Sequence, residues 1–467
     1  MSRAFLLALC AVMALNSSPS GAAAKGSTLA LVGATLIDGT GTTPLPDSVI
    51  LIADGRIAAV GSAGKLAIPA DARILRLGGK YVIPGLMDAN VHLFIDIETE
   101  PLLEYEGHFD DLMVEAAQIA LRNGVTTVFD TWGPREALIS ARSRINSGQD
   151  PGARVFLAGN IIGLDGPFSN DFFPPTALSS EVVKRINAAW EQGVGADLLW
   201  QTPEEVRAKV RDYIARGQLD FLKFAASGHQ QEQLIAFSPD AQAAIVEEGH
   251  KAGLVVMSHS TSVESLRLAL EAGVDLTQHC EITGTQTIPE ATLRAIVAKR
   301  VPCAAMLKTQ KYLAWDHANN PGSRRSEIAA QNDRALIVSG AVILLTTDAG
   351  VFRPEAQSNP LFEKFLKDVP DMPIGLDGAQ FLWLQAAHEA GMAPMDALLA
   401  GTRNIAAAYG KLGELGTIEP GKRADLVVLN SNPLQDPENY RDINRVIKDG
   451  VPVDRARLPV RRFLTRE

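Results

Sequence analysis

The stretch Pro84-Gly85-Leu86-Met87-Asp88-Ala89-Asn90-Val91-His92 decides how the rest of this 467-residue chain is interpreted. An apolar run that begins at Tyr81 leads into it, which is typical of a buried β-strand. Residues two apart in a strand point to the same face, so Asn90 and His92 are expected to face the same way. An imidazole is a good ligand for a zinc-like metal ion, and an amide oxygen is a weaker one. The stretch therefore predicts a metal-binding position with one weak ligand at the end of a strand.

Seven further apolar runs follow the first one, and segments with helical periodicity lie between several of them. Helices are expected over 112–123, 239–252 and 263–271, and another over 395–409. Eight strand-and-helix units over this length predict an α/β fold, a (β/α)8 barrel over residues 81–409. A doubly wound open sheet is the alternative, but no glycine-rich phosphate-binding turn supports it. The eight expected strands are 81–92, 125–130, 154–161, 220–226, 254–259, 274–279, 301–306 and 341–348.

Both ends of the chain outside the expected barrel are rich in strand-forming residues. Residues 25–80 alternate apolar with polar positions in places, and Asp54-Gly55 is a typical hairpin turn. Residues 410–467 become β-rich again from Gly416 onward. We expect the two ends, 25–80 and 410–467, to pair into one small β-sandwich beside the barrel.

Polar side chains stand near the ends of several expected strands, where the active site of a parallel barrel lies. Taken singly, each has a structural explanation: a lone histidine is usually a satisfied polar group, and Asp348 could cap the following helix. Lys223, inside an apolar strand, is harder to explain, because an unpaired buried ammonium is costly. As a set from separate strands they predict a metal site, in which Asp348 is also the catalytic residue. The expected ligands are His92, Lys223, His259, His279 and Asp348, with Asn90 as a weak sixth.

Residues shortly beyond the strand ends are the candidates for contact with a substrate. Trp132, Phe168 and Tyr312 predict an aromatic pocket, and His229 follows the fourth strand closely enough to touch a ligand. The same residues could equally be ordinary loop anchors. No arginine in a recognisable motif follows the strands, although a pocket for a carboxylate would need such a cation near the metal.

The composition and the N-terminus limit the partners and the compartment. A formal net charge of −10 argues against nucleic acid or an anionic membrane and leaves a small-molecule substrate. Arg3, the apolar run 4–15 and Ala22-Ala23-Ala24 predict a signal peptide over residues 1–24. The protein is then exported, periplasmic or secreted, and has no membrane partner after cleavage; a retained tether is the alternative. Export would permit a bridge between Cys280 and Cys303, which could equally be two buried thiols.

The strand-end residues and two closing segments form one combination of motifs: residues 84–92, Lys223, His259, His279, 346–350, 401–406 and 416–429. In combination they resemble the amidohydrolase superfamily, in particular its imidazolonepropionase and prolidase-like members. Where that superfamily has His-x-His, this chain has Asn90-Val91-His92, a variant similar to the phenylurea and molinate hydrolase branch. The resemblance covers nearly the whole chain after the signal peptide and allows a homo-oligomer.

The resemblance implies a metal centre with one or two divalent ions, zinc being the expected one. Lys223 would be carboxylated on its amine and would bridge two ions, and Asn90 puts the second ion in question. One ion would be held by His259 and His279, and the other by His92 and Asp348 with Asn90.

The implied activity is hydrolysis of a C–N bond in an amide, carbamate or urea by a metal-activated water. Asp348 would take the proton of the water and pass it to the leaving nitrogen. Two alternatives stay open: an exported metallo-dipeptidase or carboxypeptidase, and a binding protein that has lost catalysis at Asn90.

Overall fold

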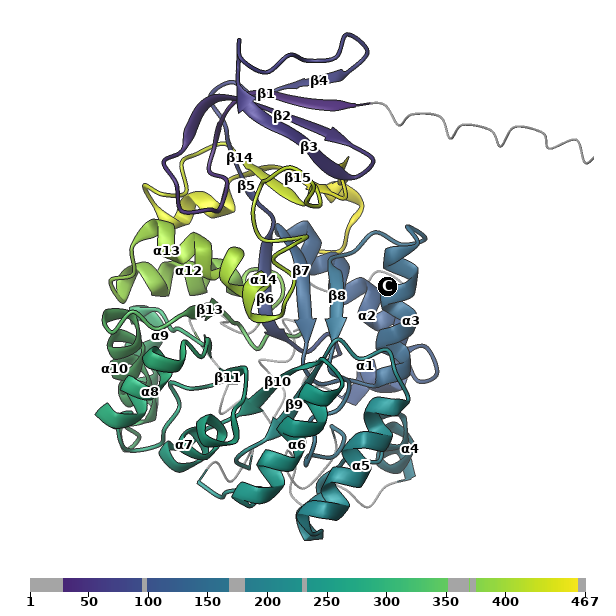
Figure 1. Cartoon of the computed structure of the whole chain (residues 1–467), viewed down its shortest axis with the longest axis vertical. Helices are drawn as coiled ribbons and strands as arrows, with labels where there is room; N and C mark the ends of the chain where they lie inside the picture. Colours follow the sequence, from purple (N-terminus) through teal and green to yellow (C-terminus); the bar gives the residue numbers. More distant parts are fainter. Residues whose placement is uncertain are drawn as a thin grey trace, which may run out of the picture.

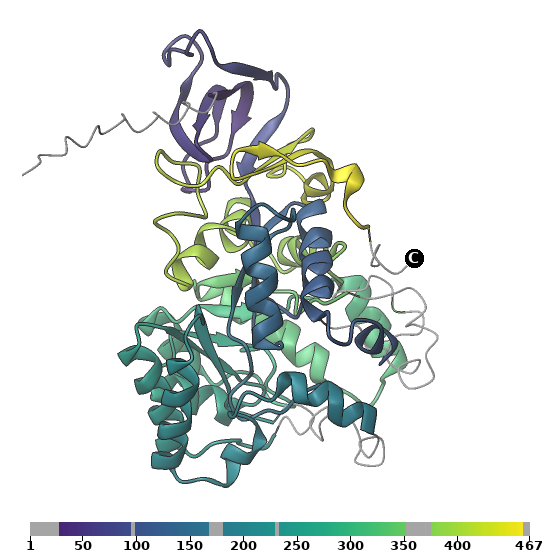
Figure 2. The same ribbon diagram turned by 90° about the vertical axis from the view of Figure 1, so that its right-hand side faces the viewer.

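The computed structural model describes residues 28–94, 99–167, 181–228, 233–351, 369 and 375–460. The expected signal peptide over 1–24, together with Phe168 and His229, lies outside the described residues. Figures 1 and 2 show a β-sheet, drawn in purple and yellow, at one end of the molecule, and parallel strands with helices around them at the other. Among the described helices, none is long and apolar enough to cross a membrane.

The sheet at that end, called the end sheet here, contains eight strands from both ends of the chain. Its order is β16-β15-β14-β5-β1-β2-β3, and β4 pairs with β1. Strand β5 joins the two chain ends, because it pairs parallel to β1 and antiparallel to β14. The strands are β1 (Leu29–Leu36), β2 (Leu45–Ala53), β3 (Arg56–Ser62), β4 (Arg73–Arg76), β5 (Tyr81–Pro84), β14 (Leu426–Leu429), β15 (Ile443–Lys448) and β16 (Val451–Pro452).

The two chain ends therefore pair as expected, but as one hydrogen-bonded sheet. The described strands of the two chain ends belong to one sheet in this order, so two separate sheets of a sandwich are not shown. The predicted hairpin between β2 and β3 turns at Asp54 and Gly55, whose φ angles of 51° and 74° are both left-handed. That conformation is the one a two-residue turn between twisted strands requires.

Eight parallel strands form two further sheets, β6-β7-β8 and β13-β12-β11-β10-β9. Two isolated parallel bridges connect the edges of these sheets, Val91 to Ala349 and Ile162 to Phe224. Their strands read as near-continuous buried runs, as the interior strands of a parallel sheet do. The strands are β6 (Leu86–Val91), β7 (Val125–Asp130), β8 (Arg154–Leu157), β9 (Phe221–Ala225), β10 (Val255–His259), β11 (Leu276–Gln278), β12 (Cys303–Ala305) and β13 (Ile343–Leu345).

The run expected as one strand over 81–92 is divided at Gly85 into β5, in the end sheet, and β6. A Cβ atom at Gly85 would lie 2.1 Å from the Oγ1 of Thr126, so this position has no room for a side chain. The chain thus passes from one sheet to the other through a glycine. The other seven expected strands all contain an observed one.

Helices lie around the parallel strands (Figure 1) and begin where the sequence places caps. Thr202 and Glu205 form a capping box at the start of α5, and Ser238 caps α6, whose first residue is Pro239. The helices are α1 (Thr99–Glu104), α2 (Phe109–Arg122), α3 (Arg135–Asn146), α4 (Glu181–Trp190), α5 (Pro203–Ala215), α6 (Pro239–Lys251), α7 (Val263–Ala272), α8 (Glu290–Lys299), α9 (Gln310–Asn319), α10 (Arg325–Val338), α12 (Ala379–Glu389), α13 (Pro394–Ala400) and α14 (Arg403–Ala408). Short 3-10 turns are η2 (Ala196–Trp200), η4 (Pro437–Arg441) and η5 (Arg455–Arg457).

The single helix expected over 395–409 is wrong, since two helices, α13 and α14, meet at Gly401 and Thr402. The carbonyl of Gly401 accepts a hydrogen bond from the backbone N–H of Met87 in β6, 2.8 Å away. A contact with a distant strand therefore replaces the helical bond at this point. Cys280 and Cys303 are both buried and both free thiols.

Candidate active site

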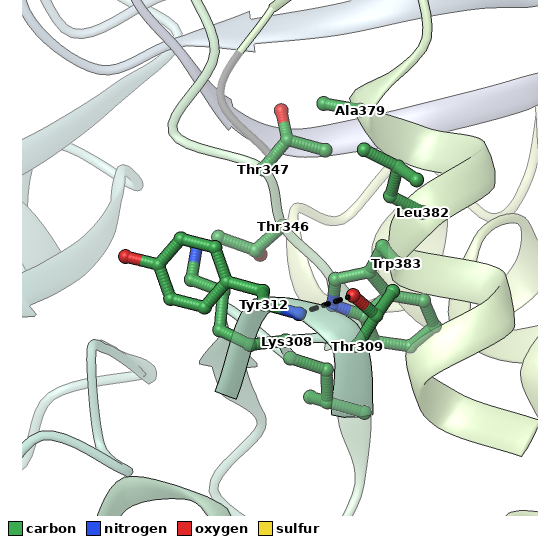
Figure 3. Close-up of a pocket in the computed structure, with 9 residues that line it drawn as sticks. Lys308, Thr309, Tyr312, Thr346, Thr347, Ala379, Leu382 and Trp383 are labelled. Carbon is green, nitrogen blue, oxygen red and sulfur yellow. Dashed lines mark hydrogen bonds between the residues drawn. The ribbon is translucent and has the colours of Figure 1, made fainter. Parts of the chain in front are cut away.

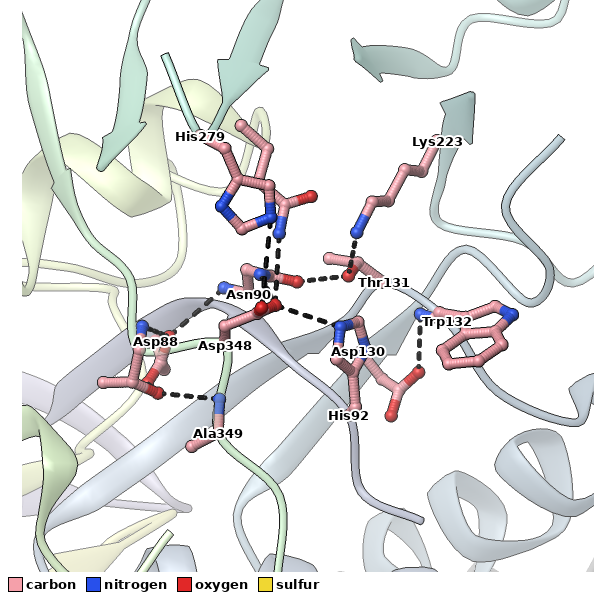
Figure 4. Close-up of polar contacts among 12 residues, drawn as sticks. Asp88, Asn90, His92, Asp130, Thr131, Trp132, Lys223, His279, Asp348 and Ala349 are labelled. Carbon is pink, nitrogen blue, oxygen red and sulfur yellow. Dashed lines mark hydrogen bonds and ion pairs between the residues drawn. The ribbon is translucent and has the colours of Figure 1, made fainter. Parts of the chain in front are cut away.

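The polar residues predicted from the strand ends come together at the carboxyl ends of the parallel strands (Figure 4). Asn90 lies in β6, Lys223 in β9 and His259 at the end of β10, while His279 directly follows β11. Asp348 lies three residues beyond the end of β13. The register of the neighbouring strands β9 and β10 pairs His259 with Ala225, two residues beyond Lys223, so Lys223 and His259 point to the same face of these strands.

Asp348 is the centre of this cluster. Its Oδ1 lies 3.0 Å from the Nε2 of His92, and its Oδ2 lies 3.9 Å from the Nε2 of His279. The amide Nδ2 of Asn90 donates a hydrogen bond to Oδ1 of the same carboxylate, and Gln278 donates a longer one of 3.4 Å. The side chain of Asp348 is 23% exposed while that of His92 is 8% exposed, so the carboxylate is the part of the cluster most open to a ligand.

Lys223 reaches the cluster through Thr131. Its ammonium donates a 2.9 Å hydrogen bond to the Oγ1 of Thr131, whose hydroxyl in turn donates to the Oδ1 of Asn90. Lys223 is buried, and no carboxylate within the described residues lies close enough to form an ion pair with it. His259 joins from the side of His279, with the two rings edge to face and their centroids 4.9 Å apart.

Two members of the cluster have a left-handed backbone, which is uncommon for residues other than glycine. His279 and Asp348 both have φ of 58°. Backbone hydrogen bonds hold the two residues in this conformation, from His279 to Ala304 and from Asp348 to Asn90. Such a conformation costs free energy and is enriched at functional sites, which supports a functional role for both residues.

Burial and mutual charge set the protonation of the cluster. Burial lowers the pKa of His92, so its imidazole is neutral and donates a hydrogen bond from Nε2 to the carboxylate it faces. Burial would raise the pKa of Asp348, but the nearby His279 and the hydrogen bond from His92 hold that pKa well below its usual value. Burial lowers the pKa of Lys223 to about 8.

Two buried carboxylates brace the strands that carry the cluster. Asp88 accepts a 2.6 Å hydrogen bond from the hydroxyl of Thr347 and so fixes the segment that leads to Asp348. Asp130 accepts the backbone N–H groups of Leu93 and Trp132 at 2.8 and 3.2 Å. Burial raises the pKa of Asp88 to about 7 and that of Asp130 to about 8.

The residues predicted to touch a substrate are placed differently from one another. Trp132 is buried beside His92, with the two rings edge to face and their centroids 5.8 Å apart. Its indole N–H donates a hydrogen bond to Asn160, so Trp132 packs against His92 and supports the position of that imidazole. Tyr312 lines a hollow next to the segment before Asp348 (Figure 3). Phe168 and His229 lie outside the described residues.

The donor set has the chemistry that a divalent metal ion needs: three imidazoles, a carboxylate and an amide, with a lysine beside them. As they lie, however, the side chains bond to one another, and Asn90 and His92 share one oxygen of Asp348. Within the described part of the chain, no three His, Cys, Asp or Glu side chains are arranged to hold a metal ion. The residues therefore supply the types of donor atom that a divalent metal ion binds, but their side chains are not arranged around one.

Several residues of the site could not be found from the sequence. Thr131 and Gln278 are neutral, and their only signal is that each stands at the end of an expected strand. Lys308 stands two residues beyond the seventh expected strand, and no sequence motif marks it.

Comparison with known proteins agrees with this geometry. The model of the amidohydrolase family matches residues 81–453. A solved structure of molinate hydrolase is 38% identical over 95% of this chain and 98% of that one, with a TM-score of 0.87. For phenylurea hydrolase B the identity is 37%, over 94% of this chain and 100% of that one, and the TM-score is 0.87.

A curated relative, the imidazolonepropionase of Deinococcus deserti, is 25% identical over 84% of this chain and 88% of its own length. The ochratoxinase of Aspergillus niger is also 25% identical, over 87% of this chain and 82% of its own. The family model covers most of the chain, including every residue of the cluster. The chain belongs to the amidohydrolase family and is a hydrolase of carbon–nitrogen bonds.

Proposed function

We propose that this amidohydrolase is metal-dependent and hydrolyses an amide, carbamate or urea bond of a small molecule. The observation that carries the proposal is the convergence of Asn90, His92, His279 and Asp348 on one point at the strand ends. The similarity to molinate and phenylurea hydrolases, at 38% and 37% identity, supports a non-peptide bond.

The metal ligands would be those expected from the sequence, with zinc as the preferred ion and one or two ions per subunit. His259, His279 and a carboxylated Lys223 would hold one ion, and His92 and Asp348 the other, with Asn90 as a weak ligand. When bound, the ion would supply an acidified water and polarise the carbonyl oxygen of the substrate.

The residues of the chain would manage the proton. Asp348 is ionised and the most open member of the cluster, so it can accept the proton released by the attacking water. It would then give this proton to the nitrogen as the C–N bond breaks, because an amide nitrogen leaves poorly without protonation. Asn90 and His92, which bond to Asp348, would hold the carboxylate in place.

Two bridges support the proposal that the parallel strands close into a (β/α)8 barrel. Near the bridge from Ile162 to Phe224, the N–H of Ile162 donates to Lys223 at 2.8 Å. Near the bridge from Val91 to Ala349, the N–H of His92 donates to Ala349 at 2.9 Å. We also propose export, on the strength of the signal-like residues 1–24 alone.

Metal analysis of the purified protein tests metal dependence. We expect at least one tightly bound divalent ion per chain, loss of turnover on chelation, and recovery when zinc is added back. A panel of aryl ureas, N-acyl amino acids and dipeptides would identify the bond, with dipeptides testing the dipeptidase alternative. Absence of bound metal, together with no activation by added metal, would favour the binding protein instead.

Substitution of Asp348 by Asn tests the proton transfer. The amide cannot accept the proton of the water, so we expect turnover to fall by about 10²-fold or more. Metal content, measured by elemental analysis, should stay near the wild-type value for the ion held by His259, His279 and Lys223. Turnover close to wild type in Asp348→Asn would remove this residue from the mechanism.

A further inference from the structure

A hollow lies beside the candidate active site, between the ends of β12 and β13 and the helix α12 (Figure 3). Thr346 and Thr347, which line it, directly precede Asp348, so the hollow is next to the proposed catalytic carboxylate. Leu382 and Trp383 of α12 form an apolar wall. The indole N–H of Trp383 is already used by the carbonyl of Ala305, at 2.8 Å, so this wall offers no polar group of its own.

Two hydrogen-bond donors in this hollow have no partner among the residues that the structure describes. The hydroxyl of Thr346 is fully buried and bonds to nothing. The ammonium of Lys308 has no hydrogen bond or ion pair, and lies 5.7 Å from the ring centroid of Tyr312. By contrast, Thr347 and Thr309, which line the same hollow, bond to Asp88 and to the backbone N–H of Tyr312.

The charges around Lys308 leave its ammonium without direct compensation. Burial lowers the pKa of Lys308, while Glu281, Asp348 and Asp333 act against that effect. Glu281 and Asp333 are themselves buried, and burial raises the pKa of both. One oxygen of each lacks a hydrogen-bond partner in the described structure, so neither is paired with the lysine directly. A half-buried cation without an ion pair is best stabilised by an anionic group from a ligand.

We propose that Lys308 and Thr346 bind a carboxylate of the substrate, so that this hydrolase prefers C–N compounds that carry a carboxylate near the scissile bond. The ammonium would supply the charge, the hydroxyl of Thr346 a second donor, and Tyr312 and Trp383 the apolar contact. This inference rests on the proposed hydrolysis at Asp348. Lys308 would be the cation near the proposed metal site, which no sequence motif indicates. The end of the seventh expected strand would then determine substrate specificity.

Equilibrium binding to the metal-loaded enzyme tests the subsite with two matched probes. N-acetyl-L-phenylalanine carries the carboxylate, and N-phenethylacetamide is the same scaffold without it. By calorimetry we expect the wild type to bind the carboxylate compound about tenfold more tightly. In Lys308→Met this preference should fall to about threefold or less, and Lys308→Arg, which keeps the charge, should restore much of it.

Lys311→Met is the matched control, because Lys311 is exposed in α9, which begins two residues after Lys308, and does not line the hollow. It should keep the wild-type preference, and melting curves would show that every variant is folded. Equal binding of the two probes by the wild type, no detectable binding of either, or an unchanged preference in Lys308→Met would each overturn the inference. Since binding needs no turnover, these outcomes are distinct from a failure of the proposed hydrolysis, which the metal and substrate assays report.

Discussion

The amide of Asn90 bonds to two partners at once, giving a hydrogen bond to Asp348 and accepting one from Thr131. A neutral histidine at this position could donate through one ring nitrogen and accept through the other, but as a metal ligand it would use the accepting nitrogen on the ion. Asn90 therefore links the proposed catalytic carboxylate to the chain that runs through Thr131 to Lys223. At this position, therefore, an asparagine that forms hydrogen bonds to Asp348 and Thr131 stands in place of a histidine, which is the stronger metal ligand.

The substitution Asn90→His tests whether the amide limits metal binding. An imidazole is the better ligand, so we expect the number of tightly bound ions per chain to rise toward two, with a changed turnover rate. Elemental analysis after dialysis measures the stoichiometry. Asn90→Ala is the control, since it removes the amide and adds no ligand. An unchanged metal content in Asn90→His, in a protein that melts like the wild type, would contradict this view.

The residue types of the cluster were predictable from the sequence, but the contacts between these residues were not. His92, His279 and Asp348 stand out in the sequence because ionisable side chains at strand ends need a reason. Thr131 has no such signal, since a threonine after a strand is ordinary. Its role depends on the distance to Lys223, 92 positions later in the chain, and only the three-dimensional fold sets that distance.

At the scale of the elements, α5 and α6 are clamped together by one carboxylate. Glu248 of α6 is 5% exposed and bonds to Arg211 at 3.0 Å, Arg207 at 3.0 Å and Lys251 at 2.8 Å. Chiefly through the bond from Arg211, the pKa of Glu248 is lowered to about 2. This clamp lies on the outer helices, away from the site.

Glu248→Gln should lower stability in a pH-dependent way. Because the pKa is depressed in the folded state, the stabilisation is complete above the usual value of about 4.3 and disappears as the pH falls toward about 2. We expect the variant to be less stable by about 1–2 kcal/mol at pH 7, a gap that narrows below pH 4.5. Urea unfolding at pH 7, 5 and 3.5 measures it.

Glu247→Gln is the matched control, because Glu247 is exposed on the same helix and, among the residues that the structure describes, bonds only to Arg207. Exposed pairs contribute little, so this change should leave stability within about 0.5 kcal/mol. If the gap between wild type and Glu248→Gln were the same at all three pH values, the clamp would not be ionic.

The sequence predicted the bounds of an element well where neighbouring residues determine those bounds. Ser238 and Pro239 start α6 within one residue of the expected position, because caps act within a single turn. The break at Gly401 depends on the N–H of Met87, so no property of residues 395–409 alone could have shown it. The pairing of the two chain ends was predictable from their strand-forming residues, but their joining through β5 into one hydrogen-bonded sheet was not.

At the scale of the whole molecule, Arg154 ties the parallel strands to the end sheet. This residue begins β8, and its guanidinium lies 3.3 Å from Asp425 and 2.7 Å from Asp449, which flank β14 and β15. Arg154 and Asp425 are 9% and 4% exposed, so the pair is shielded from water. Removing one partner of a buried pair leaves the other charge uncompensated.

Arg154→Met should therefore destabilise the junction by about 3–5 kcal/mol, because Asp425 stays buried without its cation. Urea unfolding measures the loss. Arg267→Met is the control: Arg267 forms exposed pairs within α7, and its removal should cost about 0.5 kcal/mol or less. A loss in Arg154→Met no larger than in the control would mean that the junction depends on apolar packing instead.

The position of β5 between β1 and β14 has a kinetic consequence. A ribosome makes β5 more than 300 residues before the strand that completes its hydrogen bonds, and the slow formation of such distant pairs exposes unpaired edges meanwhile. During synthesis the edge of β5 waits for β14, while the parallel strands in between can already assemble. The half-built end sheet is thus the part of the nascent protein most in need of protection from aggregation.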